Sequence, residues 1–163
     1  MTHQVDILRA DYTDPSQRSA IPCLLNAYAK GLLGFRKEID GHVLKALVPG
    51  LERMHNAVVL LARIDDAYVG MAICFLGFST FHAKPLINIH DFMVLKEFRG
   101  QGVGRALLKK IESIARDRDC CKITLEVQEN NTSARRLYRR NGFTDSFLAQ
   151  EAGDQLSMTK TID

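Results

Sequence analysis

The chain has 163 residues, a length typical of a single domain, and its 46% hydrophobic and 25% charged residues are ordinary proportions for a globular protein. Its net charge of +3, without a basic segment interleaved with aromatic residues, does not predict nucleic-acid binding. No apolar run approaches the roughly 20 residues of a membrane span, and the first residues lack the layout of a signal peptide, so we expect a cytoplasmic protein that binds no membrane.

The first half of the chain carries patterns typical of both helices and strands. Strands are expected at residues 5–12, 57–64, 68–78 and 86–95, and helical segments at residues 15–34 and 42–48. Because proline lacks the N–H that an inner helical turn needs, Pro22 should limit the first helical segment or fall in its first turn, and Pro49 should end the second. The last three strands follow one another closely, which predicts a meander.

The second half begins with an amphipathic helix at residues 102–118, where apolar residues recur every three or four positions. Residues 122–128 alternate between apolar and polar side chains and therefore predict a strand. The next helix should begin after Asn131 as its N-cap and end at Gly142 in a left-handed C-cap. Residues 156–162 offer one more strand.

No repeat, linker or low-complexity tract divides these elements, so we predict one α/β domain over residues 1–163 with a mixed sheet. The four cysteines contain no C-x-x-C pair, and the adjacent Cys120 and Cys121 would point to opposite faces of a strand. We therefore predict no metal site.

Gly100, Gly102 and Gly104 stand between the strand at 86–95 and the helix at 102–118. A glycine-rich turn before a helix presents backbone N–H groups at the positive end of the helix dipole, which favours an anion. The turn lacks the Lys and Ser or Thr of a P-loop, and a dinucleotide fingerprint would need glycine where Arg105 stands. The turn therefore predicts an anion site of another kind.

Three motifs follow one another in this region. Residues 99–104 read RGQGVG and fit the pattern R/Q-x-x-G-x-G/A; residues 89–94 read IHDFMV; and residues 129–143 read ENNTSARRLYRRNGF and contain N-x-x-A-x-x-L-Y-x-x-x-G-F. By the order and spacing of these motifs the chain resembles the GNAT superfamily, the N-acetyltransferases that use acetyl-CoA. The resemblance implies a single-domain fold with a mixed, mostly antiparallel central sheet flanked by helices.

The resemblance also divides the domain into an acceptor-side part at about 1–85 and an acetyl-CoA-binding core at about 86–143. Backbone amides of the glycine turn would hold the pyrophosphate of acetyl-CoA, and the strand before it would bind the pantetheine arm as a further strand. The residues implied in binding acetyl-CoA are Phe92, Met93, Val94, Arg99, Gly100, Gln101, Gly102, Val103, Gly104, Arg105 and Asn131.

Two residues are catalytic candidates. The resemblance places the hydroxyl of Tyr138 beside the sulfur of acetyl-CoA, as the general acid for the departing thiolate. His90 stands where the family often has a glutamate, and an imidazole, whose ordinary pKa is about 6.5, suits a general base at neutral pH. The alternative for His90 is a half-buried structural histidine. Asp91 would point to the opposite face of the strand unless a bulge intervenes.

The acceptor is expected to be a primary amine of a small molecule. The segment GFSTFHAKP at residues 77–85 resembles the polyamine and diamine acetyltransferases, and Glu38, Asp40 and Glu52 could attract a cation. An acceptor site would then be built from the first two helices and residues 77–86. Three alternatives stay open: a protein N-terminus or lysine as acceptor, an acyl-CoA sensor without catalysis, and a nucleotide-binding protein unrelated to CoA. Because members of the family commonly form dimers, a homodimer is compatible with the resemblance.

Overall fold

The computed structural model describes residues 4–31, 34, 36–145 and 160–161. Within these ranges five strands form one sheet, in the order β1-β2-β3-β4-β5. The strands are β1 (Val5–Arg9), β2 (Ala57–Ile64), β3 (Ala67–Ser79), β4 (Lys84–Val94) and β5 (Ile123–Leu125). The first four are antiparallel neighbours, and β5 runs parallel to β4. The prediction of a mixed, mostly antiparallel sheet is therefore confirmed.

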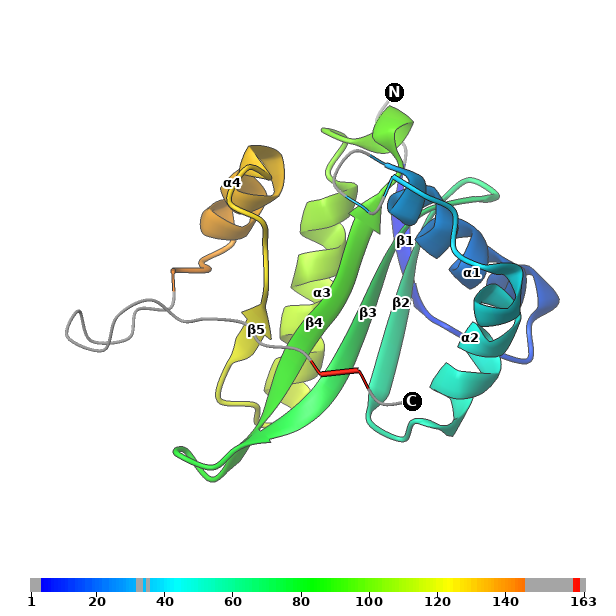
Figure 1. The fold of residues 1–163 in the computed structure, drawn as a ribbon. Helices are drawn as coiled ribbons and strands as arrows, with labels where there is room; N and C mark the ends of the chain where they lie inside the picture. Colours follow the sequence, from blue (N-terminus) through cyan, green and yellow to red (C-terminus); the bar gives the residue numbers. More distant parts are fainter. Residues whose placement is uncertain (1–3, 32–33, 35, 146–159, 162–163) are drawn as a thin grey trace.

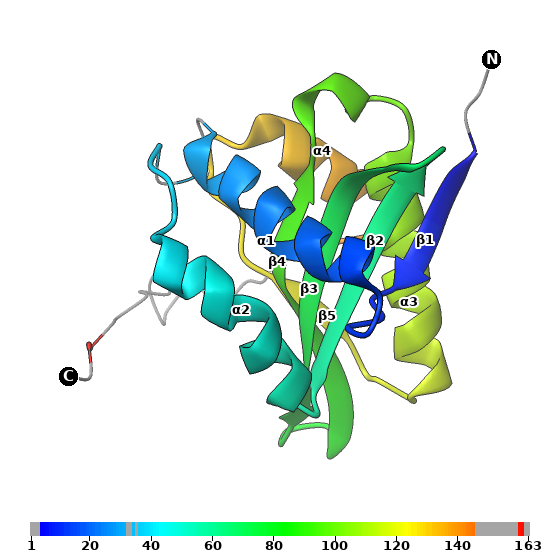
Figure 2. The same cartoon turned by 90° about the vertical axis from the view of Figure 1, so that its right-hand side faces the viewer.

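Helices cover both faces of this sheet. The helices α1 (Pro15–Lys30) and α2 (Gly41–Arg53) lie over one face, which we call the α1/α2 face, and α3 (Val103–Asp117) lies over the other, the α3 face (Figure 1, Figure 2). The last helix, α4 (Thr132–Arg140), packs on the α3 side, where its Leu137 and Tyr138 join the same apolar cluster as α3. A short 3-10 helix (Lys96–Phe98) leads from β4 into the glycine turn.

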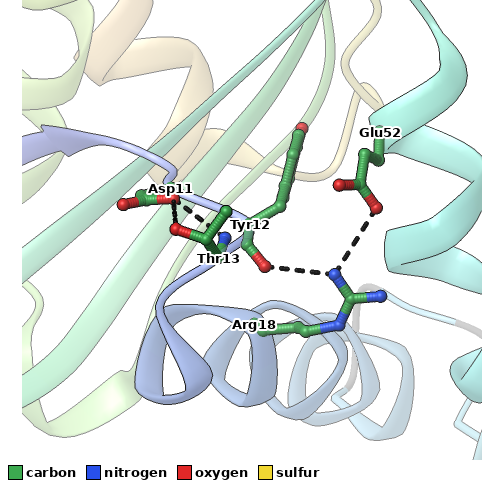
Figure 3. Close-up of polar contacts among 5 residues, drawn as sticks. All are labelled: Asp11, Tyr12, Thr13, Arg18 and Glu52. Atoms are coloured by element: carbon green, nitrogen blue, oxygen red, sulfur yellow. Dashed lines mark hydrogen bonds and ion pairs between the residues drawn. The ribbon is translucent and has the colours of Figure 1, made fainter.

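The two helices of the α1/α2 face are joined to each other by polar contacts at one end. The guanidinium of Arg18 on α1 donates to the backbone carbonyl of Tyr12 at 3.1 Å and pairs with Glu52 on α2 at 3.5 Å (Figure 3). In the loop before α1, the carboxylate of Asp11 accepts hydrogen bonds from the backbone N–H and the hydroxyl of Thr13. The Glu52 carboxylate, which we expected to attract a cationic acceptor, is thus already beside an arginine.

Both proline predictions are wrong. Pro22 lies well inside α1, and Pro49 lies inside α2 with one further turn after it. Each proline removes one backbone hydrogen bond from its helix. The neighbouring side chains explain why the helices continue, because Ile21 and Leu24 beside Pro22 are almost completely buried, and tertiary packing contributes more to helix stability than local propensity does.

Two strands are shorter than their sequence patterns predict. The first ends at Arg9 because residues 11–14 form a turn, and β5 ends at Leu125 although the alternation extends to residue 128. The parallel pairing between β4 and β5 stops at Ile89 and Leu125, where β4 becomes irregular. A bulge bends its strand and disrupts the ladder, so β5 has no partner beyond this point. The strand expected at 156–162 falls almost entirely outside the described residues.

Candidate active site

The edge of β4 that faces β5 is open along its C-terminal half. β4 pairs with β3 up to Val94, but with β5 only over Ile87–Ile89. The N–H of Leu95 donates to the carbonyl of Val69 at 2.8 Å, and backbone groups alternate sides along a strand. The backbone groups of Phe92 and Val94 therefore face the open edge. Those of Met93 face β3, so Met93 offers no backbone group to a ligand at this edge.

β4 contains a bulge just before these residues. Its register with β3 pairs Ile73 with Asp91 and Cys74 with Ile89, so His90 is left without a partner on β3. Ile73 packs in the apolar cluster of the α1/α2 face, and Asp91, which is paired with Ile73, lies on the same face. The ring of His90 contacts Phe75, which packs against the same cluster. His90 and Asp91 therefore both lie on the α1/α2 face, although the regular period of a strand would separate them.

His90 is an exposed residue at this bulge. Its ring stands edge-on to that of Phe75, with the centroids 5.5 Å apart and the planes at 76°. Among the described residues no hydrogen bond to the imidazole is formed. The alternative of a half-buried histidine held by hydrogen bonds inside the sheet does not describe this side chain. An exposed imidazole can exchange its proton with solvent.

Asp91 is half-buried, and within the described part of the chain its carboxylate has no hydrogen bond and no ion pair. Burial raises the pKa of the Asp91 carboxyl above its ordinary value, and the neighbouring His90 acts in the opposite direction. A desolvated carboxylate without a partner is in an unfavourable position. A cation placed beside it would relieve this cost.

Glycine is required at the three positions of the turn for two different structural reasons. Gly100 and Gly102 have φ angles of +78° and +87°, in the region that favours glycine, and a Cβ on either would meet nothing within 4 Å. Gly104 has an ordinary backbone, but a Cβ there would lie 2.8 Å from Cδ2 of Leu137 on α4. The first two glycines shape the turn, and the third lets α4 pack closely against α3.

The N-terminus of α3 is open beside this turn. Its N-cap, Gly102, has no side chain to bond the first N–H groups, and the first turn of a helix leaves such groups without partners inside the helix. Val103 buries its side chain in the core, so only its backbone N–H faces the turn, whereas Gly104 is partly exposed and Arg105 is exposed. These N–H groups and the helix dipole favour an anion.

Two side chains of the turn bond back to the backbone before it. Nε of Arg99 donates to the carbonyl of Val94 at 3.0 Å, and Nε2 of Gln101 donates to the carbonyl of Glu97 at 3.0 Å. The carbonyl of Val94 is one of the groups on the open edge of β4. Arg99 therefore connects the open edge to the glycine turn and holds the turn close to it.

Tyr138 lies on α4 with only 7% of its surface exposed. Its ring contacts those of Phe92 on β4, at a centroid distance of 5.8 Å, and Phe143 after α4, at 5.7 Å. Burial raises the pKa of the Tyr138 hydroxyl to about 12, and the nearby Tyr28 acts in the same direction. The hydroxyl therefore keeps its proton at neutral pH, and no described residue is hydrogen-bonded to it.

Tyr28 is a site residue that sequence reasoning missed. It belongs to α1 and packs with the cluster of the α1/α2 face, whereas Tyr138 belongs to the cluster of the α3 face. Tyr28 contributes to the raised pKa of the Tyr138 hydroxyl, although the two tyrosines belong to apolar clusters on opposite faces of the sheet. No motif in the sequence singles out Tyr28, because its spacing in α1 is that of a core residue.

Asn131 caps α4 as predicted, since its Oδ1 accepts a hydrogen bond from the backbone N–H of Ala134 at 3.2 Å. The other end of α4 is closed by Gly142, whose φ is +86°, and by a hydrogen bond from the N–H of Phe143 to the carbonyl of Tyr138 at 3.1 Å. These two caps fix the position of Tyr138 between them. The side-chain N–H groups of Asn131 donate to no described residue.

The other acids expected at an acceptor site are arranged differently. Glu38 pairs with Lys30 and Glu52 with Arg18, while Asp40 is exposed at the N-cap of α2. Two of the three carboxylates are therefore neutralised by basic side chains. Among the described residues, no three His, Cys, Asp or Glu side chains gather in a way that could hold a metal ion. No helix in the same part of the chain is long and apolar enough to cross a membrane.

Comparisons with known proteins agree on one family. The model of the acetyltransferase (GNAT) family matches residues 7–143. The N-acetyltransferase YhfO of Bacillus subtilis (strain 168), itself uncharacterized, is 26% identical over 130 residues, which are 80% of this chain and 85% of the relative. The thialysine N-epsilon-acetyltransferase of Bos taurus is 34% identical over 77 residues, which are 47% of this chain and 45% of that enzyme.

The fold also has close matches among solved structures. The crystal structure of a probable acetyltransferase superposes with a TM-score of 0.79 over 97% of this chain and 99% of that one, at 18% sequence identity. At this identity the match concerns the fold alone. It covers both the sheet and the helices on its two faces.

Proposed function

Because the chain belongs to the acetyltransferase (GNAT) family and is an N-acetyltransferase, we propose that it transfers the acetyl group of acetyl-CoA to a primary amine of a small molecule. The observation that carries this proposal is the open edge of β4, which begins at the bulge and runs into the glycine turn. An extended ligand with an anionic group at one end fits that arrangement.

The residues along this path have distinct proposed roles in binding acetyl-CoA. Phe92 and Val94 offer backbone groups to the pantetheine arm, which carries two amides and can pair as a strand does. The backbone of residues 99–105 and the N-terminus of α3 hold the pyrophosphate. Asn131 contacts CoA with its amide, and Met93 contributes its side chain to the wall of the α1/α2 face.

Acetyl transfer needs an unprotonated amine and a stabilised leaving thiolate. In the proposed reaction His90 takes a proton from the acceptor ammonium, and the free amine attacks the thioester carbonyl. The C–S bond then breaks, and Tyr138 donates a proton to the thiolate. The attacking nitrogen gives up a second proton to form the amide, and this proton passes through solvent and restores the Tyr138 phenol. With a pKa of about 12, Tyr138 is protonated before the reaction and can fill this role.

The proposed acceptor is an alkyl amine. The name of the bovine relative states that its acceptor is the N-epsilon amine of thialysine, and the alignment with that relative covers less than half of this chain and less than half of that enzyme. The face on which an acceptor would lie is the α1/α2 face, because His90 is exposed there. A cytoplasmic location and a homodimer stay predictions.

The first experiment is thermal unfolding with and without acetyl-CoA. At a ligand concentration of about 100 times Kd, the unfolding free energy should rise by about 2.7 kcal/mol, which corresponds to several degrees in Tm. Adenosine diphosphate serves as the matched control, since it carries a pyrophosphate without the pantetheine arm. Stabilisation by the nucleotide but not by acetyl-CoA would contradict the proposal.

Turnover is then measured as thiol release with a panel of acceptors: diamines, polyamines, thialysine, and a peptide with a free N-terminus and one lysine. We expect kcat/KM for at least one small amine to exceed that for the peptide by tenfold or more. A preference for the peptide would assign the enzyme to protein acetylation. Binding of acetyl-CoA without turnover of any amine would favour the alternative of an acyl-CoA sensor without catalysis.

A further inference from the structure

The α1/α2 face of β4 carries one carboxylate whose place in the structure is otherwise unexplained. Asp91 is half-buried, next to the candidate base His90, and no described residue is hydrogen-bonded or ion-paired to it. The surface acids Glu38 and Glu52, in contrast, are each paired with a basic side chain. Asp91 is thus a carboxylate beside the candidate base that forms no ion pair with any described residue.

The bulge explains how this carboxylate came to lie beside His90. In a regular strand the side chains of consecutive residues point to opposite faces. Here the register shift between Ile73 and Cys74 places His90 and Asp91 on one face, while Ile89 and Phe92 on either side of them belong to the α3 face. Two polar groups of different chemistry, an imidazole and a carboxylate, therefore face the same side of the sheet next to the open edge.

From this geometry we infer that Asp91 binds the ammonium group of the acceptor, and that the site accordingly selects alkyl amines that are cationic at neutral pH. The inference rests on the proposed acetyl transfer. The ammonium donates a hydrogen bond to the carboxylate of Asp91 and loses one proton to the imidazole of His90. The neutral amine then carries the lone pair that forms the N–C bond, and the exposed imidazolium releases its proton to solvent.

The division of roles follows from burial. The carboxylate of Asp91 is half-buried and therefore partly removed from water. An ion pair in such a place is stronger than one at the surface. The raised pKa of its carboxyl reflects the same desolvation, which a bound cation would offset. His90 is exposed and has access to solvent, as a group that must return its proton after each turnover requires.

The test measures the affinity of amines for the protein saturated with CoA, by titration calorimetry. The probes are 1,4-diaminobutane, spermidine and thialysine, with 1,4-butanediol as the neutral counterpart of the first. For the wild-type protein we expect at least one amine to bind and butanediol to bind at least about tenfold more weakly. Asp91→Asn should weaken amine binding about 10- to 100-fold, the effect of losing a charged hydrogen-bond partner, and should leave butanediol unchanged.

Asp66→Asn is the matched control, because it removes a carboxylate of the same kind from an exposed turn. It should change none of these affinities. The affinity for CoA should be the same in the wild type and both variants, since Asp91 lies on the face away from α3.

In turnover, Asp91→Asn should raise KM for the amine while kcat changes less than about threefold. His90→Gln, in contrast, should lower kcat with little change in amine affinity.

Three results would overturn the inference. The first is amine affinity in Asp91→Asn that stays within twofold of the wild type. The second is a loss of kcat without a rise in KM, which would make Asp91 part of the chemistry. The third is a wild-type protein that binds CoA but none of the amines. Failure of the proposed function is a separate observation, because it would appear as an absence of acetyl-CoA binding in the wild-type protein itself.

Discussion

The two faces of β4 differ sharply in the side chains that they present. On the α3 face, Ile87, Ile89, Phe92 and Val94 pack against an apolar cluster that also includes α3 and α4. On the α1/α2 face, the same strand presents Asn88, His90 and Asp91 before Met93 rejoins the core. One strand thus contributes an uninterrupted apolar row to one layer and three polar side chains to the other.

The difference indicates that one face of the sheet serves mainly stability and the other serves mainly ligand binding. Burial of apolar side chains on the α3 face supplies stability and fixes the glycine turn at the start of α3. On the α1/α2 face, Asn88 is hydrogen-bonded to Thr124, whereas His90 and Asp91 form no hydrogen bond with any described residue, which costs stability and makes them available to a ligand. If this division is correct, substitutions on the α3 face should change stability, and substitutions at the open edge or on the α1/α2 face should change activity.

The largest effect is expected from Leu107→Ala. Leu107 is completely buried in the cluster of the α3 face, and removing such a side chain leaves a cavity that costs about 2 to 5 kcal/mol of unfolding free energy. Urea denaturation measures the change. Val43→Ala on α2, where 44% of the side chain is exposed, is the control and should cost less than about 0.5 kcal/mol. Equal losses of unfolding free energy in the two variants would show that the α3 face is not the main source of stability.

Tyr138→Phe should separate activity from stability. Without its hydroxyl the departing thiolate loses a proton donor, and we expect kcat to fall by about 10- to 1,000-fold while the affinity for acetyl-CoA stays the same. Tyr68→Phe is the control, since it removes a hydroxyl that contacts Ser16 near the start of α1. The measurement is thiol release under saturating substrate, and an unchanged kcat would exclude Tyr138 as the general acid.

The same tyrosine should leave a signature in alkaline solution. Its pKa of about 12 in the folded protein lies above the ordinary value of 10.0, so between these two pH values the unfolded chain releases a proton that the folded chain retains. The contribution to stability is therefore complete below pH 10 and is lost as the pH rises to 12, by up to about 2.7 kcal/mol. Urea denaturation of the wild type and Tyr138→Phe from pH 9.5 to 11.5 should show a smaller decline in the variant. Parallel declines would mean that Tyr138 is not desolvated.

The smallest effect is expected from Asp91→Asn on stability. Because burial raises the pKa of the Asp91 carboxyl, its charged form is disfavoured by folding, and the neutral amide should raise the unfolding free energy at pH 7.5. The gain should shrink as the pH falls toward 4, where the wild-type carboxyl takes up a proton. Chemical denaturation at both pH values measures it. A loss of stability at pH 7.5 would show that Asp91 has a structural partner.

Much of the architecture was predictable because it depends on local patterns. The strand at 57–64 has the predicted bounds, α3 differs from its prediction by a residue at each end, and α4 has the expected caps at Asn131 and Gly142. Periodicity and capping act within a few residues of one another. The helices that continue through Pro22 and Pro49 were mispredicted for the opposite reason, since their continuity depends on packing against distant strands.

The sequence by itself determined the family, the order of the elements, and the turn in which Gly100 and Gly102 adopt positive φ angles, because these properties are written in short motifs. Tertiary structure alone decided which residues meet. The bulge that brings His90 and Asp91 to one face exists only in the register between β3 and β4, and the open edge exists only because β5 stops pairing at Leu125. Such contacts depend on the pairing of segments far apart in the chain, and no local pattern encodes them.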